Sequence, residues 1–186
     1  MTVELRRRLF TVEDYYGMAR AGILDEDDRV ELIEGEILEM AAIGSRHAAC
    51  VNRLNQLLSG TAGDGVIVSV QNPVRLSDLS EPQPDLAVLR PREDFYEGAH
   101  PGPDDVLLIV EVALTTLELD REVKAPLYAR AGVPELWIVN LEDRALEVYR
   151  EPSDGRYRTA QRMGPDDAVS PEALPAVTVR VEEVLG

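Results

Sequence analysis

The chain has 186 residues, of which 45% are hydrophobic and 29% charged, a usage that indicates a folded globular protein and excludes disordered and collagenous classes. Nineteen basic and 35 acidic side chains give a net charge of −16, which argues against a protein that coats nucleic acid through a basic surface. The longest apolar run, 106–110, is far below the ~20 residues of a membrane span, and Cys50, the only cysteine, can form no intrachain disulfide. We therefore expect one cytoplasmic domain over 1–186.

The first third of the chain predicts two helices separated by a β-hairpin. A capping-box pattern begins a short helix over 12–20. Residues 30–40 form two short stretches in which alternate side chains fall on opposite faces, and Glu34-Gly35 between them favours a tight turn. This alternation places Glu31 on the same face as an apolar neighbour. Apolar side chains recur at spacings of three and four over 45–58, the period of a second helix.

The rest of the chain alternates between branched apolar stretches and turn residues. Asp120 can cap a helix that runs to residue 131, which Pro126 should distort. Residues 91–105 contain three prolines and predict a long loop. The tail, 173–185, predicts an edge strand or a short helix. Strands are predicted over 65–76, 83–89, 106–113, 135–140, 145–150 and 156–163. This order of elements indicates an α/β domain around a mixed sheet.

Two carboxylates stand out from this pattern. Glu111 lies inside the apolar run 106–113, where an unpaired buried charge would cost several kcal/mol. It is either a metal ligand or catalytic group at the end of a central strand, or it lies on a face that reaches solvent. Asp85 opens another strand after Pro84, which alone is also ordinary turn chemistry. Together, carboxylates on adjacent strands are the way that proteins hold Mg²⁺.

The only lysine of the chain, Lys124, is a third candidate. One turn inside the predicted helix, its ammonium could reach the mouth of the sheet and orient a water or balance charge on a phosphoryl group. It could equally be a solvated surface lysine. His47 and His100 are too isolated to suggest a zinc site, and we predict surface or capping roles for both. The sequence contains no glycine-rich phosphate loop and no GxSxG motif, which disfavours P-loop hydrolysis and serine esterase chemistry.

Three stretches carry a family resemblance. VELIEG at 30–35, QPDLAVL at 83–89 and the segment 106–140 together resemble the Uma-two family of predicted endonucleases, within the PD-(D/E)XK nuclease superfamily. The resemblance extends over roughly 11–185. It implies a restriction-endonuclease-like core, αβββαβ, with a mixed central sheet flanked by helices and preceded by an N-terminal helix and hairpin.

The same resemblance implies roles for particular residues. Asp85 matches the first metal-binding carboxylate and Glu111 the second. The superfamily's lysine usually stands two residues after that acid, where this chain has Ala113, so Lys124 corresponds to variants in which the lysine has moved to the following helix. Glu31 matches an acidic position near the metal. The implied cofactor is Mg²⁺, with Mn²⁺ as a substitute.

Three hypotheses follow. The first is a metal-dependent endonuclease that hydrolyses DNA phosphodiester bonds, with Asp85 and Glu111 holding Mg²⁺, Lys124 positioning the attacking water, and Glu31 holding a second ion or a water. The second is a catalytically inactive, dimeric nuclease-like interaction module, because a charge of −16 repels DNA unless arginines gather on one face. Candidates for that face are Arg6 to Arg8, Arg90, Arg92, Arg156, Arg158 and Arg162. The third is a hydrolase of a smaller phosphodiester, with the 91–105 loop as a lid.

Overall fold

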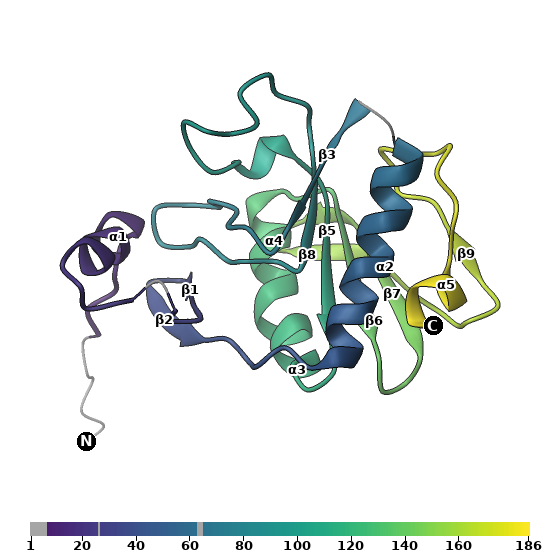
Figure 1. Ribbon diagram of the computed structural model, residues 1–186, viewed down its shortest axis with the longest axis horizontal. Helices are drawn as coiled ribbons and strands as arrows, with labels where there is room; N and C mark the ends of the chain where they lie inside the picture. The colour runs from purple at the N-terminus through teal and green to yellow at the C-terminus, as the bar shows by residue number, and fades with distance from the viewer. Residues whose placement is uncertain (1–6, 26, 63–64) are drawn as a thin grey trace.

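A six-stranded sheet forms the centre of the computed structural model, which describes residues 7–25, 27–62 and 65–186 (Figure 1). Its strands lie in the order β3-β4-β5-β6-β7-β8, and all neighbours are antiparallel except β5 and β6. The strands are β3 (Ile67–Val70), β4 (Leu86–Leu89), β5 (Val106–Ala113), β6 (Glu135–Asn140), β7 (Ala145–Ser153) and β8 (Arg156–Met163). The six predicted strands are therefore present, although the first covers only part of 65–76 and the second only part of 83–89.

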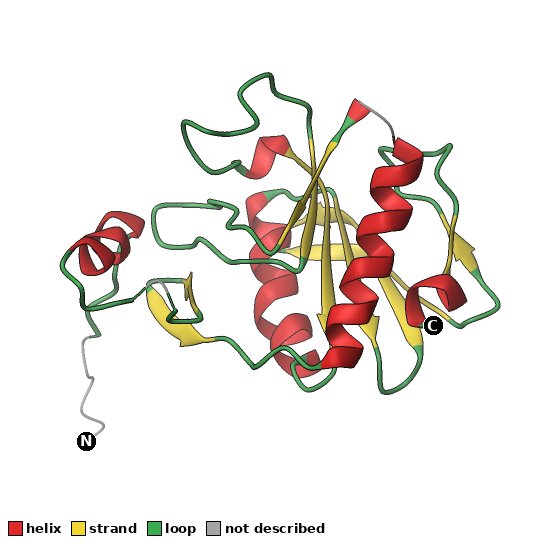
Figure 2. Cartoon of the chain, in the orientation of Figure 1, coloured by secondary structure: helices red, strands yellow, loops and turns green. Residues whose placement is uncertain are grey.

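Helices cover both faces of this sheet (Figure 2). Because side chains alternate along a strand, Val110 and Val112 of β5 pack under α2 (Ser45–Ala62) and α5 (Val181–Leu185), while Ile109 and Ala113 face the opposite way. The opposite face is covered by a helical segment that connects β5 to β6. Its parts are α3 (Leu117–Leu119), the π-helical turn η3 (Asp120–Lys124) and α4 (Ala125–Ala131). The order α2-β3-β4-β5-α4-β6 is the expected αβββαβ core.

The connecting helix begins earlier than predicted. It starts at Leu117, so Asp120 does not cap it but lies inside it, where its side chain is buried. Pro126 has no N–H, and its ring clashes with the carbonyl four residues earlier in a regular helix. The turn just before it is widened: Ala125 N–H donates to the carbonyl of Asp120, five residues back. The predicted distortion is therefore confirmed.

The N-terminal helix and hairpin lie to one side of the sheet (Figure 1). They consist of α1 (Val12–Arg20), β1 (Val30–Ile33) and β2 (Glu36–Glu39), as predicted. Glu34 and Gly35 both have positive φ, 50° and 80°, which is the geometry of a type I′ turn. The hairpin is fastened to the segment that leads into β4, where the N–H of Glu81 donates to the carbonyl of Leu32 at 2.8 Å. This attachment carries β1 to the end of the sheet where β4 begins.

The C-terminal part adds only short elements. The tail forms β10 (Val179–Arg180), which pairs with β9 (Ala168–Val169), and then α5. The loop 91–105 is interrupted by a 3₁₀ turn, η2 (Pro103–Asp105). Among the described residues, no helix is long and apolar enough to cross a membrane.

Candidate functional site

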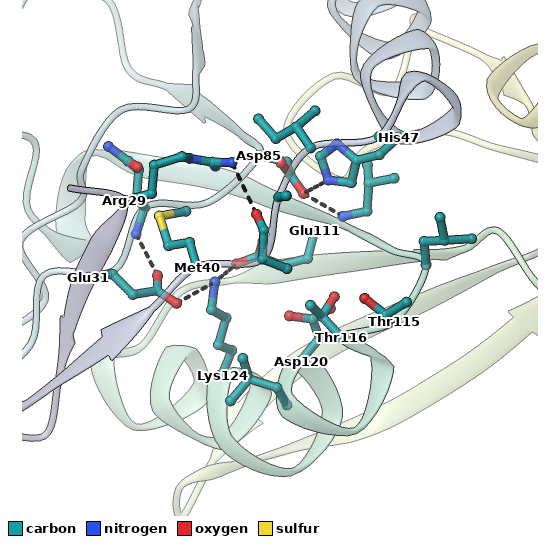
Figure 3. A pocket seen from close by; sticks show the side chains of 18 of the residues that line it. Arg29, Glu31, Met40, His47, Asp85, Glu111, Thr115, Thr116, Asp120 and Lys124 are labelled. Atoms are coloured by element: carbon teal, nitrogen blue, oxygen red, sulfur yellow. Dashed lines mark hydrogen bonds and ion pairs between the residues drawn. The ribbon is translucent and has the colours of Figure 1, made fainter. Parts of the chain in front are cut away.

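A pocket of about 430 Å³ opens at one end of the sheet. Its walls come from the hairpin, the first turn of α2, the ends of β4 and β5, and the π-helical turn η3 (Figure 3). All four residues chosen from the sequence lie here. The charged residues that line it are Glu31, Glu39, Asp85, Glu111 and Asp120, with Arg29 and Lys124. Carboxylates therefore outnumber basic groups five to two.

The register of the sheet brings the two central carboxylates together. β4 and β5 are antiparallel, and Leu86 is paired with Val110. Asp85 lies immediately before β4, and continuing this register by one residue places it opposite Glu111 of β5. The sequence predicted that Glu111 lies within a strand and that Asp85 opens one; Glu111 does lie within β5, whereas Asp85 is the residue just before β4.

Asp85 is held by three donors from different parts of the chain. The N–H of Val112 donates to Oδ2 at 2.9 Å, His47 Nε2 lies 3.0 Å from the same oxygen, and Gln71 Nε2 donates to Oδ1 at 3.2 Å. His47 lies on the first turn of α2 and lines the pocket, so the predicted surface or capping role is wrong. Its Nδ1 is buried and has no hydrogen-bond partner among the described residues.

Glu111 is buried, with 3% of its surface exposed, and is compensated by two donors. Its Oε1 accepts hydrogen bonds from the Tyr128 hydroxyl at 2.6 Å and from Lys124 Nζ at 3.3 Å. Burial raises the pKa of the Glu111 carboxyl to about 8; the Lys124 charge opposes the rise, and Asp120 and Asp85 add to it. The solvent-facing interpretation of Glu111 is therefore excluded.

Lys124 is buried between two glutamates. Its Nζ lies 3.1 Å from Glu31 Oε1 and 3.3 Å from Glu111 Oε1, and Glu31 Oε2 accepts the main-chain N–H of Gln83 at 3.0 Å. Burial by itself lowers the pKa of an ammonium, but Glu111 and then Glu31 hold the pKa of Lys124 above its ordinary value. The only lysine of the chain is thus a charged group inside the pocket and not a surface residue.

Asp120 belongs to the same cluster, although the sequence pattern suggested only a helix cap. It is 3% exposed and accepts a hydrogen bond from the Thr116 hydroxyl at 2.9 Å. Burial raises the pKa of the Asp120 carboxyl to about 6, against the opposing charge of Lys124. The sequence did contain one signal that Asp120 lies near Lys124: the two residues are four positions apart, and helical residues at that spacing share a face.

The loop 91–105 takes no part in this pocket. β4 runs away from Asp85 and β5 returns toward Glu111, so the loop that joins them lies at the opposite end of the sheet (Figure 1). None of its residues lines the pocket. The lid assigned to it under the third hypothesis is wrong.

The donor set of the pocket suits one kind of metal ion. Within 7–25, 27–62 and 65–186, no three His, Cys, Asp or Glu side chains are grouped as metal ligands. Mg²⁺, however, commonly takes one or two carboxylates and completes its octahedron with waters and substrate phosphate. Asp85 and Glu111 supply two adjacent hard oxygen ligands in a pocket rich in negative charge. These residues fit such an ion.

The fold matches a known structure. It superposes on a crystal structure described as a putative nuclease belonging to DUF820 from Anabaena variabilis ATCC 29413, with a TM-score of 0.72 and 15% sequence identity, over 95% of this chain and 97% of the other. The chain thus has a nuclease-like fold, as expected.

The family follows from the sequence itself. Residues 12–182 match the model of the Uma2 family, described as "Putative restriction endonuclease", and the chain belongs to this family. A comparison with curated protein sequences gives no match. The resemblance identified from the sequence is confirmed.

Proposed function

We propose that the protein is a metal-dependent endonuclease that hydrolyses DNA phosphodiester bonds. One observation carries the proposal: Asp85, at the start of β4, and Glu111 of the neighbouring strand β5 line one pocket, and the Lys124 ammonium lies 3.3 Å from Glu111 in it. Family membership supports a nuclease generally. The metal dependence and the roles of the individual residues are the parts that this proposal adds.

Asp85 and Glu111 would hold Mg²⁺, or Mn²⁺ in its place. When bound, such an ion polarises a phosphoryl oxygen and lowers the pKa of a coordinated water. Both hydrogen bonds of Glu111 go to Oε1, so Oε2 has no donor among the described residues and is free to act as a ligand. The three donors on Asp85 fix its carboxylate before any ion arrives, which lowers the cost of binding.

Lys124 and Glu31 would act as a pair. The Lys124 ammonium points into the pocket and can orient the attacking water or stabilise charge that develops on the phosphoryl oxygens. Glu31 holds the ammonium from the side away from Glu111. A second metal ion at Glu31 would require Lys124 to leave this position, so positioning of Lys124 is the role that the geometry favours for Glu31.

One observation favours the inactive module as a second candidate. Lys124 compensates both Glu31 and Glu111 without any metal, so the cluster is also a stable ion-paired network in a protein that performs no chemistry. Under this alternative the protein would act as a homodimer and bind neither Mg²⁺ nor Mn²⁺. Calorimetric titration distinguishes the two candidates, because absence of binding at millimolar Mn²⁺ contradicts the endonuclease.

Nicking of supercoiled plasmid with Mg²⁺ or Mn²⁺ tests the endonuclease directly. We expect Glu111→Gln and Lys124→Met to reduce the nicking rate by about 10² or more, because each removes a charge at the reacting phosphate. Glu147→Gln is the matched control: Glu147 is also buried and paired with an arginine, Arg121, but lies outside the pocket. Equal activity in all three variants would overturn the assignment.

A further inference from the structure

The arginines of the protein fall into two groups. Nine of the described arginines form an ion pair with an Asp or Glu side chain: Arg7, Arg20, Arg75, Arg92, Arg121, Arg130, Arg150, Arg162 and Arg180. Others have no carboxylate side chain as a partner within the described part of the chain. Three of these, Arg46, Arg53 and Arg144, line one hollow of about 310 Å³, which we call the arginine hollow.

Each of the three guanidinium groups is held by neutral main-chain carbonyls. Arg46 donates to Leu141 at 3.1 Å, Arg53 donates to residues 184 and 185 at 3.3 and 3.2 Å, and Arg144 donates to Gly186 at 3.3 Å. A carbonyl orients a guanidinium but does not cancel its charge. No Asp or Glu side chain is among the described residues that line the hollow.

This hollow lies next to the candidate active pocket. The first turn of α2 separates them: Gly44 and His47 line the pocket, while Ser45 and Arg46 line the hollow. On the far side, the N–H of Leu141 donates to the carbonyl of Ala113 at 2.9 Å, which holds the turn after β6 at the end of the sheet where the pocket opens. The hollow and the pocket are therefore adjacent, on either side of the first turn of α2.

We propose that the arginine hollow binds a backbone phosphate of the DNA strand, beside the phosphodiester that enters the pocket; this inference rests on the proposed function. Guanidinium groups match phosphate oxygens with paired hydrogen bonds, and Arg46 and Arg144 each have further N–H donors besides the one that their carbonyl takes. In a protein with a net charge of −16, a compact group of uncompensated arginines beside the pocket supplies the local attraction that the whole surface does not.

The test is DNA affinity as a function of salt. Fluorescence anisotropy with a labelled duplex, in Mg²⁺, would use the Glu111→Gln protein as the parent so that binding is measured without cleavage. The double variant Arg46→Gln with Arg144→Gln should raise the Kd for DNA about tenfold or more. It should also reduce the slope of the logarithm of the binding constant against the logarithm of the salt concentration, by about 0.9 for each phosphate-binding arginine removed, or about 1.8 for both. Arg46→Lys with Arg144→Lys should keep most of the slope, because the charge is kept.

The matched control is the double variant Arg156→Gln with Arg158→Gln, which removes the same amount of charge. Both residues lie on the edge strand β8, close to the turn that joins it to β7, and this turn is at the end of the sheet away from the pocket. We expect its salt slope to equal that of the parent. Equal slopes in the control and in the Arg46/Arg144 glutamine variant would overturn the assignment of the hollow while leaving the proposed function in place. Absence of DNA binding by both the parent and the wild-type protein at every salt concentration would overturn the proposed function as well. Circular dichroism checks that each variant folds. The single variant Arg144→Gln is milder, because the Arg144 side chain donates only to the carbonyl of Gly186, and it can be used in the same measurement.

Discussion

Lys124 lies between two glutamates in a space that suits a compact ammonium. We expect Lys124→Arg to reduce plasmid nicking by about 10² or more while the protein remains folded, because a planar guanidinium cannot occupy the point between Glu31 and Glu111 in the same way. The measurement is the nicking rate, with the thermal melting temperature as the check on folding. Full activity of the arginine variant would show that only the positive charge matters.

Burial of Glu111 has a consequence for stability against pH. The pKa of Glu111 is raised to about 8, above its ordinary value of 4.5, so the folded state favours the protonated form. The stability that this proton supplies is complete below about pH 4.5 and is lost as the pH rises through 8. Glu111→Gln keeps a neutral group of the same shape and should not show this loss.

We therefore expect metal-free wild-type protein to lose stability relative to Glu111→Gln between pH 5 and 8, by on the order of a few kcal/mol. Urea unfolding of both proteins at several pH values in EDTA measures the difference. Parallel stability curves would mean that Glu111 is already ionised in the folded protein at pH 5.

His47 affects the site through Asp85. We expect His47→Leu to weaken Mn²⁺ binding and to slow nicking by about 10- to 100-fold, because Asp85 Oδ2 then keeps only the N–H of Val112. His47→Gln can present an amide N–H near the position of Nε2 and should recover most of both losses. His100→Leu is the control, since that ring stacks on Tyr16 away from the pocket. If the glutamine variant is as defective as the leucine variant, the donor is not the function of His47.

At the scale of elements, the hairpin turn determines where Glu31 lies. Gly35 has φ of 80°, and a Cβ there would meet the Leu9 Cβ at 2.5 Å and the Phe10 N at 3.2 Å. We expect Gly35→Ala to destabilise the protein by about 1–3 kcal/mol and to reduce nicking, because the hairpin must shift and Glu31 with it. Gly22→Ala separates strain from crowding, since Gly22 has φ of 69° with open space around it. Thermal melting and nicking of both variants measure the effect.

The π-helical turn is the second element that shapes the pocket. Asp120 and Lys124 stand at its two ends, and both side chains are buried at the pocket. Proline in the helix was visible in the sequence, and a distortion was predicted from it. Its form, one widened turn that directs both residues toward Glu111, depends on packing against the sheet and had no separate signal in the sequence.

At the scale of the whole molecule, acidic charge sets the conditions for binding DNA. The net charge is −16, and carboxylates outnumber basic groups five to two around the pocket. At constant ionic strength, we expect millimolar Mg²⁺ to lower the Kd of the wild-type protein for DNA by about tenfold or more. The same Mg²⁺ concentration should lower the Kd of the Glu111→Gln protein by a smaller factor. Anisotropy with short single-turnover incubation, compared in EDTA and in Mg²⁺, measures both. An equal effect on both proteins would indicate general screening rather than an ion held in the pocket.

Several of the arginines considered for a common DNA-binding face are paired with acids. Of the arginines considered for a common DNA-binding face, Arg6 lies outside the described residues, while Arg7, Arg92 and Arg162 are each paired with an acid. The arginines of the hollow are instead Arg46 and Arg53 of α2 and Arg144, which lies far along the chain in the turn between β6 and β7. Their grouping arises where the start of α2, the turn after β6 and the chain's last residues meet.

Much of the fold could be read from local patterns. The apolar run 106–113, the Glu34-Gly35 turn and the capping box at Thr11 each act over a few residues, so the sequence alone specifies these elements. The sequence also marked Glu111 as abnormal, because a carboxylate inside a buried strand needs a partner. It could not identify Tyr128 as one of the partners, because a tyrosine in a helix is usually part of the core.

The sequence by itself therefore determined most of the elements, the family and three of the candidate site carboxylates, because propensity, periodicity and turn chemistry are local. Only the tertiary structure decided how these groups combine: strand register made Asp85 a neighbour of Glu111, helix packing brought His47 to Asp85, and hairpin docking brought Glu31 to Lys124. These contacts join residues that are tens of positions apart in the chain. They depend on strand order and on the closure of several loops together, which no single stretch of sequence encodes.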